Sequence, residues 1–319
     1  MEKDNHIPKV SDTLFKELLL RGYALEGKTR VWDLADSKLW YLTPEQAQGF
    51  LDLEKSEEYQ KEVIQKEIDL INEHVGNVIS KVDDGPLNII DLGCGDGKKA
   101  EIFINKLKGK VKLRYCPIDI SSYMVEKAIA RLTKVNAGEV VKFQWNISDF
   151  ENLENVSTLL RHGEYKKNLF LLLGNTLGNF EINEMLYKIR ISMKEGDILV
   201  IGNGLDNRKM DEILVSYHTD EMDHFMRPLM VNLGLSGEDV EFGVRFKNSR
   251  VEVYYTLKHD KEILFQTKKI LLEKGDQILT IVSYKYTHYD LMGFLKFYFD
   301  DIQISMSEDK SYALVICKK

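Results

Sequence analysis

The stretch NIIDLGCGDGKK, residues 88–99, joins an apolar run to a glycine-rich turn and then to helix-forming residues. Asp91 stands two residues before Gly93, and Gly95 and Gly97 follow at alternate positions. Glycines are needed where a backbone turns sharply and a ligand approaches too closely for a Cβ atom. The first strand–turn–helix of a doubly wound sheet lies at the switch point where ligands bind. The stretch therefore predicts an α/β fold with a ligand site at this turn.

The segments after the turn continue the same alternation. Short β-prone runs are followed by amphipathic helical segments, which is the pattern of βαβ units and a parallel sheet. The expected strands are residues 87–92, 112–118, 140–145, 168–173 and 197–202, and the expected helices are residues 98–107, 122–135 and 184–193. We therefore predict a Rossmann-like sheet over this part of the chain.

The flanking segments differ from this pattern. Residues 11–80 are expected to be mostly helical, and residues 210–234 form a further helical stretch. Alternating segments at 251–257, 261–272 and 277–287 predict antiparallel hairpins, and the chain then continues with a helix at 289–298 and strands at 301–306 and 312–317. We expect one domain from residues 81–205 and 284–319. Residues 1–80 and 206–283 are expected to form a second, mixed helical and antiparallel β domain that covers the ligand cleft and binds substrate.

Composition excludes several classes of function. The chain has 319 residues and a formal net charge of −7, whereas a nucleic-acid-binding surface usually needs a basic face. Three cysteines without a CxxC pair argue against a zinc site or a disulfide framework, and His224 and His288 lack metal-spaced partners. The apolar runs are too short to span a membrane. We expect a cytoplasmic protein with no metal, no nucleic-acid or membrane partner, and an oligomeric state that is open but compatible with a monomer.

Two cofactors compete for the glycine turn. The dinucleotide fingerprint spaces its glycines as GxGxxG and binds pyrophosphate at a helix N-terminus. Here the spacing is GxGxG after an acid, which resembles motif I of the class I methyltransferases, whose ligand carries no phosphate. The resemblance favours S-adenosylmethionine over NAD, with Gly93 and Gly95 beside the cofactor. A glycine turn without a ligand is the remaining alternative.

Two further acids fall where such a cofactor needs them. Asp119 ends the next expected strand about 20 residues after the last glycine, where ribose hydroxyls are held. Its carboxylate can accept hydrogen bonds from both hydroxyls. Asp149 and Phe150 follow the third strand, where class I methyltransferases place an acid for the adenine amino group and an apolar residue for the ring. The alternative for Asp119 is a turn residue at the end of a strand, and the alternative for Asp149 is a helix N-cap.

A narrower resemblance begins at residues 168–180, NLFLLLGNTLGNF. This segment is similar to the fourth-strand motif of the histidine-specific methyltransferase family, whose best-known member trimethylates the α-amino group of histidine in the ergothioneine pathway. The similarity extends weakly over most of the chain. Further matches to this family are Trp40-Tyr41, Glu58-Tyr59, Lys99, Ser216-Tyr217 and the strand Ser283-x-Lys285.

The resemblance implies a role for each matching residue. Asn179 and Tyr217 would hold the substrate carboxylate, and Tyr59 and the backbone of Gly174 would face its amino group. Ser283, together with Val253 and Ile281, would face the substrate side chain. The residues around S-adenosylmethionine would be Tyr41, Gly93, Gly95, Lys99, Asp119, Asp149 and Phe150.

The residues themselves support one part of this assignment and oppose another. Asn179 follows an expected strand end, and its carboxamide is a neutral donor suited to a carboxylate, although a turn or cap role is the alternative. The family's imidazole-recognising glutamate falls on Ile281, and Val253 falls near another side-chain contact. A buried imidazole without a partner costs roughly 1–3 kcal/mol. We therefore expect an apolar or aromatic amino acid, or a similar small amine carrying a carboxylate, rather than histidine.

Methyl transfer from a sulfonium is an in-line displacement that needs mainly proximity and orientation. The resemblance implies an S-adenosylmethionine-dependent N-methyltransferase, with Tyr59 or a water contacting the amine. Two other functions stay open. One is a methyltransferase for a protein terminus, a carboxylate or another acceptor, which an open groove would favour. The other is a cofactor-binding module without catalysis, which binding without turnover would favour.

Overall fold

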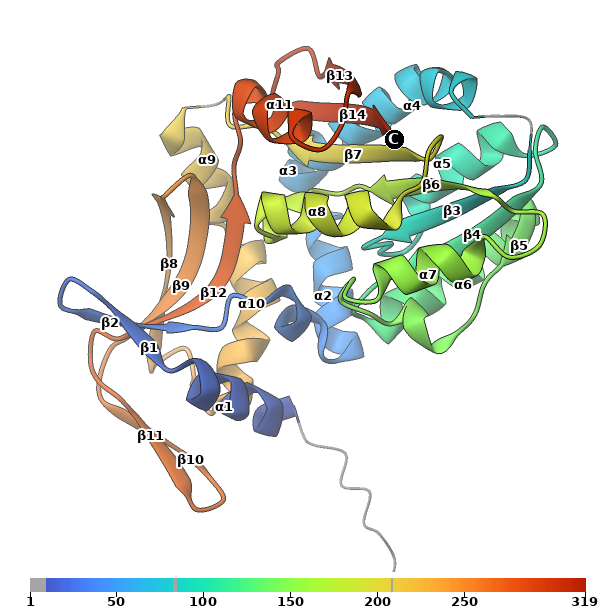
Figure 1. The fold of residues 1–319 in the computed structure, drawn as a ribbon. Coiled ribbons are helices and arrows are strands. Elements are labelled where there is room, and N and C mark those ends of the chain that lie inside the picture. The colour runs from blue at the N-terminus through green and yellow to red at the C-terminus, as the bar shows by residue number, and fades with distance from the viewer. Residues whose placement is uncertain (1–9, 83–84, 208) are drawn as a thin grey trace, which may run out of the picture. The chain divides into compact units, whose positions relative to one another are not determined.

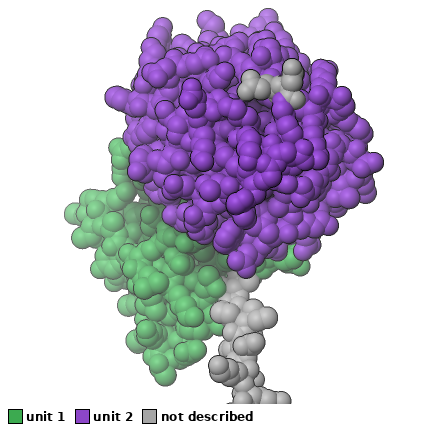
Figure 2. All heavy atoms as spheres, turned by 45° about the vertical axis from the view of Figure 1, so that its right-hand side comes forward, with its two compact units in different colours: residues 1–53, 210–283 green, residues 54–209, 284–319 purple. Residues whose placement is uncertain are grey.

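The computed structural model describes residues 10–82, 85–207 and 209–319 (Figure 1). The chain divides into two compact units, drawn in green and purple in Figure 2. Unit 1 comprises residues 1–53 and 210–283, and unit 2 comprises residues 54–209 and 284–319. Both units are discontinuous in sequence, because residues 210–283 interrupt unit 2.

Unit 2 is built on a seven-stranded sheet with the order β13-β14-β7-β6-β3-β4-β5. Five strands run parallel, and β14 is antiparallel to both of its neighbours, β7 and β13. Because the chain proceeds from β3 to β5 on one side and then crosses to β6 on the other, the switch point lies between β3 and β6. The strands are β3 (Leu87–Leu92), β4 (Leu113–Ile118), β5 (Gly138–Val140), β6 (Lys167–Leu172), β7 (Ile198–Gly204), β13 (Asp301–Met306) and β14 (Tyr312–Lys318).

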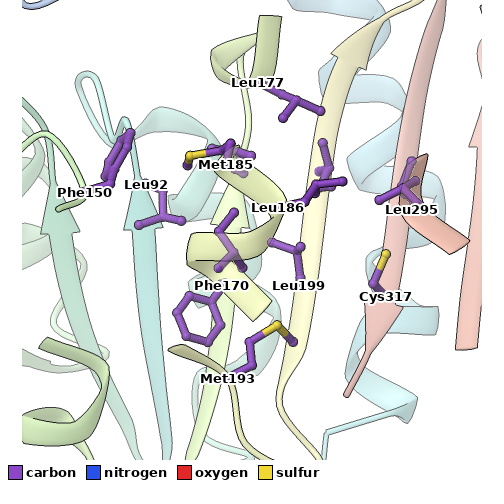
Figure 3. Packing of buried hydrophobic residues seen from close by; sticks show 14 of the residues in the cluster. Leu92, Phe150, Phe170, Leu177, Met185, Leu186, Met193, Leu199, Leu295 and Cys317 are labelled. Atoms are coloured by element: carbon purple, nitrogen blue, oxygen red, sulfur yellow. The ribbon is translucent and has the colours of Figure 1, made fainter. Parts of the chain in front are cut away.

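Helices cover both faces of this sheet, so its strands are apolar on both sides. Ile90 and Phe170 belong to a core cluster with α7, α8 and α11, part of which Figure 3 shows. The adjacent Ile89 and Leu171 belong to a second cluster with α4, α5 and α6, since successive side chains of a strand alternate between faces. The helical segments of unit 2 are α3 (Glu57–Tyr59), the π-helical η2 (Gln60–Ile64), α4 (Gln65–Ser80), α5 (Lys98–Leu107), α6 (Ser122–Val135), η3 (Gln144–Asn146), α7 (Leu153–Leu160), η4 (Thr176–Asn179), α8 (Ile182–Ser192) and α11 (His288–Lys296).

Unit 1 has a mixed five-stranded sheet with the order β1-β2-β12-β9-β8 and a separate hairpin, β10-β11. The strands are β1 (Tyr23–Glu26), β2 (Thr29–Asp33), β8 (Val240–Lys247), β9 (Arg250–Leu257), β10 (Lys261–Phe265), β11 (Lys268–Leu272) and β12 (Gln277–Tyr284). The helical segments are α1 (Val10–Arg21), η1 (Ser37–Tyr41), α2 (Pro44–Leu53), α9 (Met210–Tyr217) and α10 (Asp220–Asn232). Helix α10 contacts α1, α2 and η1.

The α/β prediction is confirmed, with two corrections within unit 2. The strand expected at residues 140–145 is wrong beyond Val140, because Asn146 folds this segment into η3. Its side chain accepts from the Phe143 N–H (2.7 Å) and donates to the Pro117 carbonyl (2.6 Å). Residues 54–80, expected with the second domain, lie in unit 2, because the apolar face of α4 packs in the same core cluster as Ile89.

Three expectations for unit 1 also need correction. Residues 23–33 form the hairpin β1-β2, not a helix, with Gly27 in the left-handed region that its turn requires. The helical stretch at 210–234 is two helices, because Thr219 caps a new helix by accepting from the Met222 N–H (3.2 Å). Strand β12 lies between β9 and β2 and pairs with β2 in parallel, so one of its two partners is supplied from far away in the sequence.

Candidate functional site

The glycine turn of unit 2 adopts a backbone that few other residues allow. Gly93, Gly95 and Gly97 all have positive φ angles, of 69°, 50° and 79°. A Cβ atom on Gly97 would lie 2.8 Å from a methyl carbon of Leu132, so this glycine permits the close packing of α5 and α6. A Cβ atom on Gly95 would meet no atom within 4 Å, so open space lies against the middle of the turn. The turn therefore offers the close backbone approach that a cofactor requires.

Asp119 follows β4 and is held against this turn. Its carboxylate accepts from the backbone N–H groups of Gly95 (3.1 Å) and Ser121 (3.0 Å), one on each oxygen. A carboxylate has about four acceptor sites, so it can accept from a ligand hydroxyl in addition to these backbone donors. Burial raises the pKa of Asp119 to about 6, although the backbone hydrogen bonds oppose this shift. The residue is thus suited to hold a vicinal diol, such as a ribose.

Asp149 and Phe150 lie on the loop next to Asp119. The loop is joined to the end of β4 by a bridge between Asp119 and Ile147 and by the Ser148 N–H, which donates to the Asp119 carbonyl (2.9 Å). Asp149 is exposed. Phe150 is buried, has a φ of 70° and packs 5.7 Å from the ring of Phe180. A bulky residue in the left-handed region is strained, and such strain is concentrated at functional sites.

The segment after β6 completes the carboxyl edge of the sheet at the switch point. Gly174 and Asn175 have φ angles of 71° and 61°, and the chain then forms η4, which ends at Asn179. The Asn175 side chain accepts from the Gly204 N–H (2.5 Å), which ties this loop to β7. A Cβ atom on Gly93 would lie 2.9 Å from the Thr176 hydroxyl oxygen, so the two loops touch. Asn179 is half-buried at this edge.

A buried charge cluster that the sequence analysis missed lies beside Gly174. Glu67 of α4 is fully buried, and its carboxylate accepts from the Gly174 N–H (2.7 Å). The Lys99 amine lies 3.1 Å from Glu67 and 3.7 Å from Glu54. Tyr59 of α3 is half-buried. Burial raises the pKa of the Tyr312 hydroxyl, and the nearby Glu67 and Tyr59 side chains raise it further. The structure thus brings Tyr59, Lys99 and Gly174 to one region of unit 2.

The remaining predicted residues belong to unit 1. The Tyr217 hydroxyl is 2.9 Å from that of Ser283, so α9 and β12 are joined by two predicted site residues. Val253 and Ile281 are buried, at 0% and 4% exposure, on the neighbouring strands β9 and β12. Tyr41 packs edge-on against Phe50 at 5.6 Å. Unit 1 therefore contains the residues predicted to face the substrate side chain, together with Tyr41 and with Tyr217, which is predicted to hold the carboxylate.

Neither a metal centre nor a membrane segment is found in the ranges that the structure describes. Among residues 10–82, 85–207 and 209–319, no group of three or more histidine, cysteine or acidic side chains could hold a metal ion. Within the same residues, no helix combines the length and the apolar character needed to cross a bilayer.

The chain is similar in sequence to one known protein family and in fold to solved methyltransferases. A family model described as "Histidine-specific methyltransferase, SAM-dependent" matches residues 47–319. No curated protein matches the chain significantly. A solved S-adenosylmethionine-dependent methyltransferase from Clostridium acetobutylicum is 13% identical, with 85% of this chain and 98% of that chain covered and a TM-score of 0.44. The magnesium protoporphyrin IX methyltransferase from Synechocystis, solved with bound SAH, is 12% identical, with 86% and 95% covered and a TM-score of 0.44.

Proposed function

Because the chain belongs to the family of histidine-specific, S-adenosylmethionine-dependent methyltransferases, we propose that it methylates the amino group of an amino acid or a similar small amine carrying a carboxylate. The acceptor proposed is not histidine. One observation carries the proposal. The glycine turn with Asp119, and the loop from Gly174 to Asn179, meet at the switch point of one sheet. A cofactor and an acceptor can therefore be held next to each other there.

In this proposal, unit 2 holds the cofactor through groups whose chemistry matches it. The Asp119 carboxylate accepts from the ribose hydroxyls, and the turn at Gly93 and Gly95 admits the ligand to the backbone. Asp149 and Phe150, on the adjoining loop, are assigned to the adenine, and Lys99 and Tyr41 to the methionine end. When bound, S-adenosylmethionine supplies an electrophilic methyl group. The chain then has only to orient the nucleophile.

The acceptor's two polar groups are assigned to neutral donors and acceptors. Asn179 and Tyr217 are assigned to the carboxylate, because amide and phenol groups donate hydrogen bonds without adding charge. Tyr59 and the backbone of Gly174 face the amine. An α-amine has a free pKa near ~8, so its neutral form is accessible at cellular pH, and binding that form suffices for attack. These residues position the amine; no side chain is required to act as a strong base.

Unit 1 is proposed to select the acceptor's side chain. Val253 and Ile281 offer only aliphatic groups, which cannot hydrogen-bond a ring nitrogen. An imidazole buried against such residues would lack a partner for its ring nitrogens, at a cost of roughly 1–3 kcal/mol. An apolar or aromatic side chain has no such cost. Phenylalanine, leucine and tyrosine are therefore better acceptors than histidine in this proposal.

The test is methyl transfer from labelled S-adenosylmethionine to a panel of free amino acids that includes phenylalanine, leucine, tyrosine and histidine. We expect N-methylated product from an apolar or aromatic member, with a higher kcat/KM than for histidine. Histidine as the best acceptor would contradict the assignment of Val253 and Ile281. Cofactor binding without transfer to any member would reject free amino acids and redirect the search to protein termini.

A further inference from the structure

Glu67 is a fully buried carboxylate that no step of the proposed reaction uses. It lies on α4, yet its two oxygens contact two other elements. Oε1 accepts from the Gly174 N–H at 2.7 Å, and Oε2 lies 3.1 Å from the Lys99 amine. Gly174 follows β6, and Lys99 stands in the first turn of α5, directly after the glycine turn. One side chain therefore connects the two loops on either side of the switch point.

The backbone around Glu67 leaves little room for any other arrangement. A Cβ atom on Gly202 of β7 would lie 2.1 Å from Oε1 of Glu67, so only a glycine at this position leaves room for the carboxylate. A Cβ atom on Gly174 would lie 2.5 Å from the Lys99 amine. Tyr312 of β14 is buried beside the same carboxylate. Contacts from the loop after β6 and from β7, α5 and β14 thus fix the place of Glu67.

We propose that Glu67 is a positioning residue for methyl transfer, which holds the Lys99 amine toward the cofactor and the Gly174 peptide toward the acceptor amine. The inference rests on the proposed function, because that function assigns Lys99 to the cofactor and Gly174 to the amine. A buried carboxylate with two such partners is costly to leave unpaired, so it keeps both loops in one arrangement. Glu67 contacts neither ligand in this proposal and acts through its two partners.

The effect of Glu67 on the pKa of Lys99 gives the proposed role a measurable consequence. Burial alone would lower the pKa of the Lys99 amine, but Glu67 and then Glu54 outweigh burial, and Asp96 adds to them, so the pKa is raised. Asp91, on β3, also faces this lysine. Removing the charge of Glu67 removes the largest opposing effect, so the pKa of Lys99 falls. A lysine with a lower pKa is protonated in a smaller fraction of molecules at high pH, so it binds an anionic group more weakly there.

The experiment compares Glu67→Gln and Glu67→Ala with the wild-type chain. Glutamine still offers an oxygen to the Gly174 N–H but presents no charge to Lys99, whereas alanine removes both contacts. Binding of S-adenosylhomocysteine is measured by calorimetry from about pH 7 to 10, and kcat and KM are measured with the best acceptor. The matched control is Asp197→Asn. Asp197 is also fully buried and charge-paired, with Arg161, but it lies before β7 at the opposite edge of the sheet.

For Glu67→Gln we expect about tenfold weaker binding of S-adenosylhomocysteine at neutral pH, and a ratio to the wild-type Kd that grows as pH rises. Glu67→Ala should lower kcat by about a further tenfold, since the Gly174 peptide is then free. Asp197→Asn should lower the thermal stability of the chain. The ratio of its Kd for S-adenosylhomocysteine to the wild-type Kd should not change with pH. Binding by Glu67→Gln within about twofold of wild type across the pH range would overturn the inference, and so would a pH profile shared with Asp197→Asn. If the wild-type chain binds the product but methylates no amino acid, the proposed acceptor fails, while the binding profiles still decide the role of Glu67.

Discussion

At the scale of single residues, the Asp119 carboxyl links cofactor binding to pH. Its pKa of about 6 lies above the ordinary value of 3.8 because the group is buried. Protonation below that value converts an acceptor oxygen into a donor, so the ribose hydroxyls lose a partner. The effect of this pKa shift on folding stability has the opposite dependence on pH. The folded state binds this proton more readily than the unfolded state, so this group alone makes the fold less stable as pH rises from about 4 to 6.

We therefore expect the affinity for S-adenosylhomocysteine to fall as pH drops through about 6, approaching a tenfold loss per pH unit below it. Calorimetric titrations between pH 5 and 8 measure this effect. Asp119→Asn is the control, since its neutral side chain cannot titrate and should bind weakly at every pH. An unchanged wild-type affinity at pH 5 would contradict the assignment of Asp119 to the ribose.

The side chain at position 281 is expected to decide between acceptors. Ile281→Glu places a carboxylate where the family resemblance puts one, and a hydrogen bond to a charged group contributes about 1.5–3 kcal/mol. The ratio of kcat/KM for histidine to that for phenylalanine should rise by at least about tenfold. Ile281→Met keeps the site apolar and should leave the ratio unchanged. A ratio that does not move in a folded Ile281→Glu variant would exclude this position from substrate recognition.

At the scale of elements, the glycine turn is expected to tolerate no side chain at position 97. Gly97→Ala combines a φ of 79° with a Cβ atom 2.8 Å from Leu132, and we expect about 2 kcal/mol or more of lost folding stability. Gly76→Ala is the matched control, because Gly76 lies inside α4 and its Cβ atom would meet nothing within 4 Å. That variant should gain roughly 0.5–1 kcal/mol. Urea denaturation of both variants measures the difference, and equal effects would refute the packing argument.

The elements that the sequence predicts well are those whose pattern is local. Residues 87–92, 98–107 and 122–135 form β3, α5 and α6 at the expected residues, since buried apolar runs and capped helices carry their own signals. The segment from Val141 to Trp145 is rich in β-prone residues, yet the side chain of Asn146 bonds to Pro117 of another strand and ends the pairing. Strand β12 depends on β2, which is far away in sequence. Pairing between segments so far apart produces no periodic pattern in the local sequence.

The candidate site shows the same limit. Spacing pointed to Asp119 and a strand-end position pointed to Asn179, because the carboxyl ends of parallel strands meet at one edge, whereas Gly174 was implied only by the family resemblance. Glu67 was missed, since a glutamate within a Glu- and Lys-rich helix reads as part of a solvated face. One signal existed: Glu67 is three residues after Ile64 and four before Ile71, on the apolar stripe of its helix. A charge on such a stripe needs a partner, and the partner belongs to another element.

At the scale of the whole molecule, unit 2 is expected to fold without unit 1. Its two core clusters draw only on residues of unit 2. The chain leaves unit 2 and re-enters it at neighbouring positions of the fold. Leu205 pairs with Tyr286, and the Asp206 N–H donates to the Tyr286 carbonyl (2.8 Å). A chain of residues 54–209 and 284–319, joined by a glycine–serine linker of about six residues, should unfold cooperatively.

This shortened chain should still bind S-adenosylhomocysteine, more weakly than the full chain, and should transfer no methyl group because Tyr217 and Ser283 are missing. Thermal unfolding and calorimetry test both statements. A shortened chain that is folded but does not bind would show that unit 2 alone lacks the cofactor site. One that fails to fold would show that its two cores are insufficient.

The position of β14 has a consequence for how fast the chain reaches its native state. This strand pairs with β7 from Tyr312 opposite Gly204 to Lys318 opposite Ile198, which is more than a hundred residues away in sequence. Pairings between such distant segments close late, because loop entropy is lost before any contact is gained. Until β14 arrives, β7 is an unpaired apolar edge, and such edges recruit strands from other molecules. Assistance from chaperones during synthesis would therefore matter more for this chain than its final stability suggests.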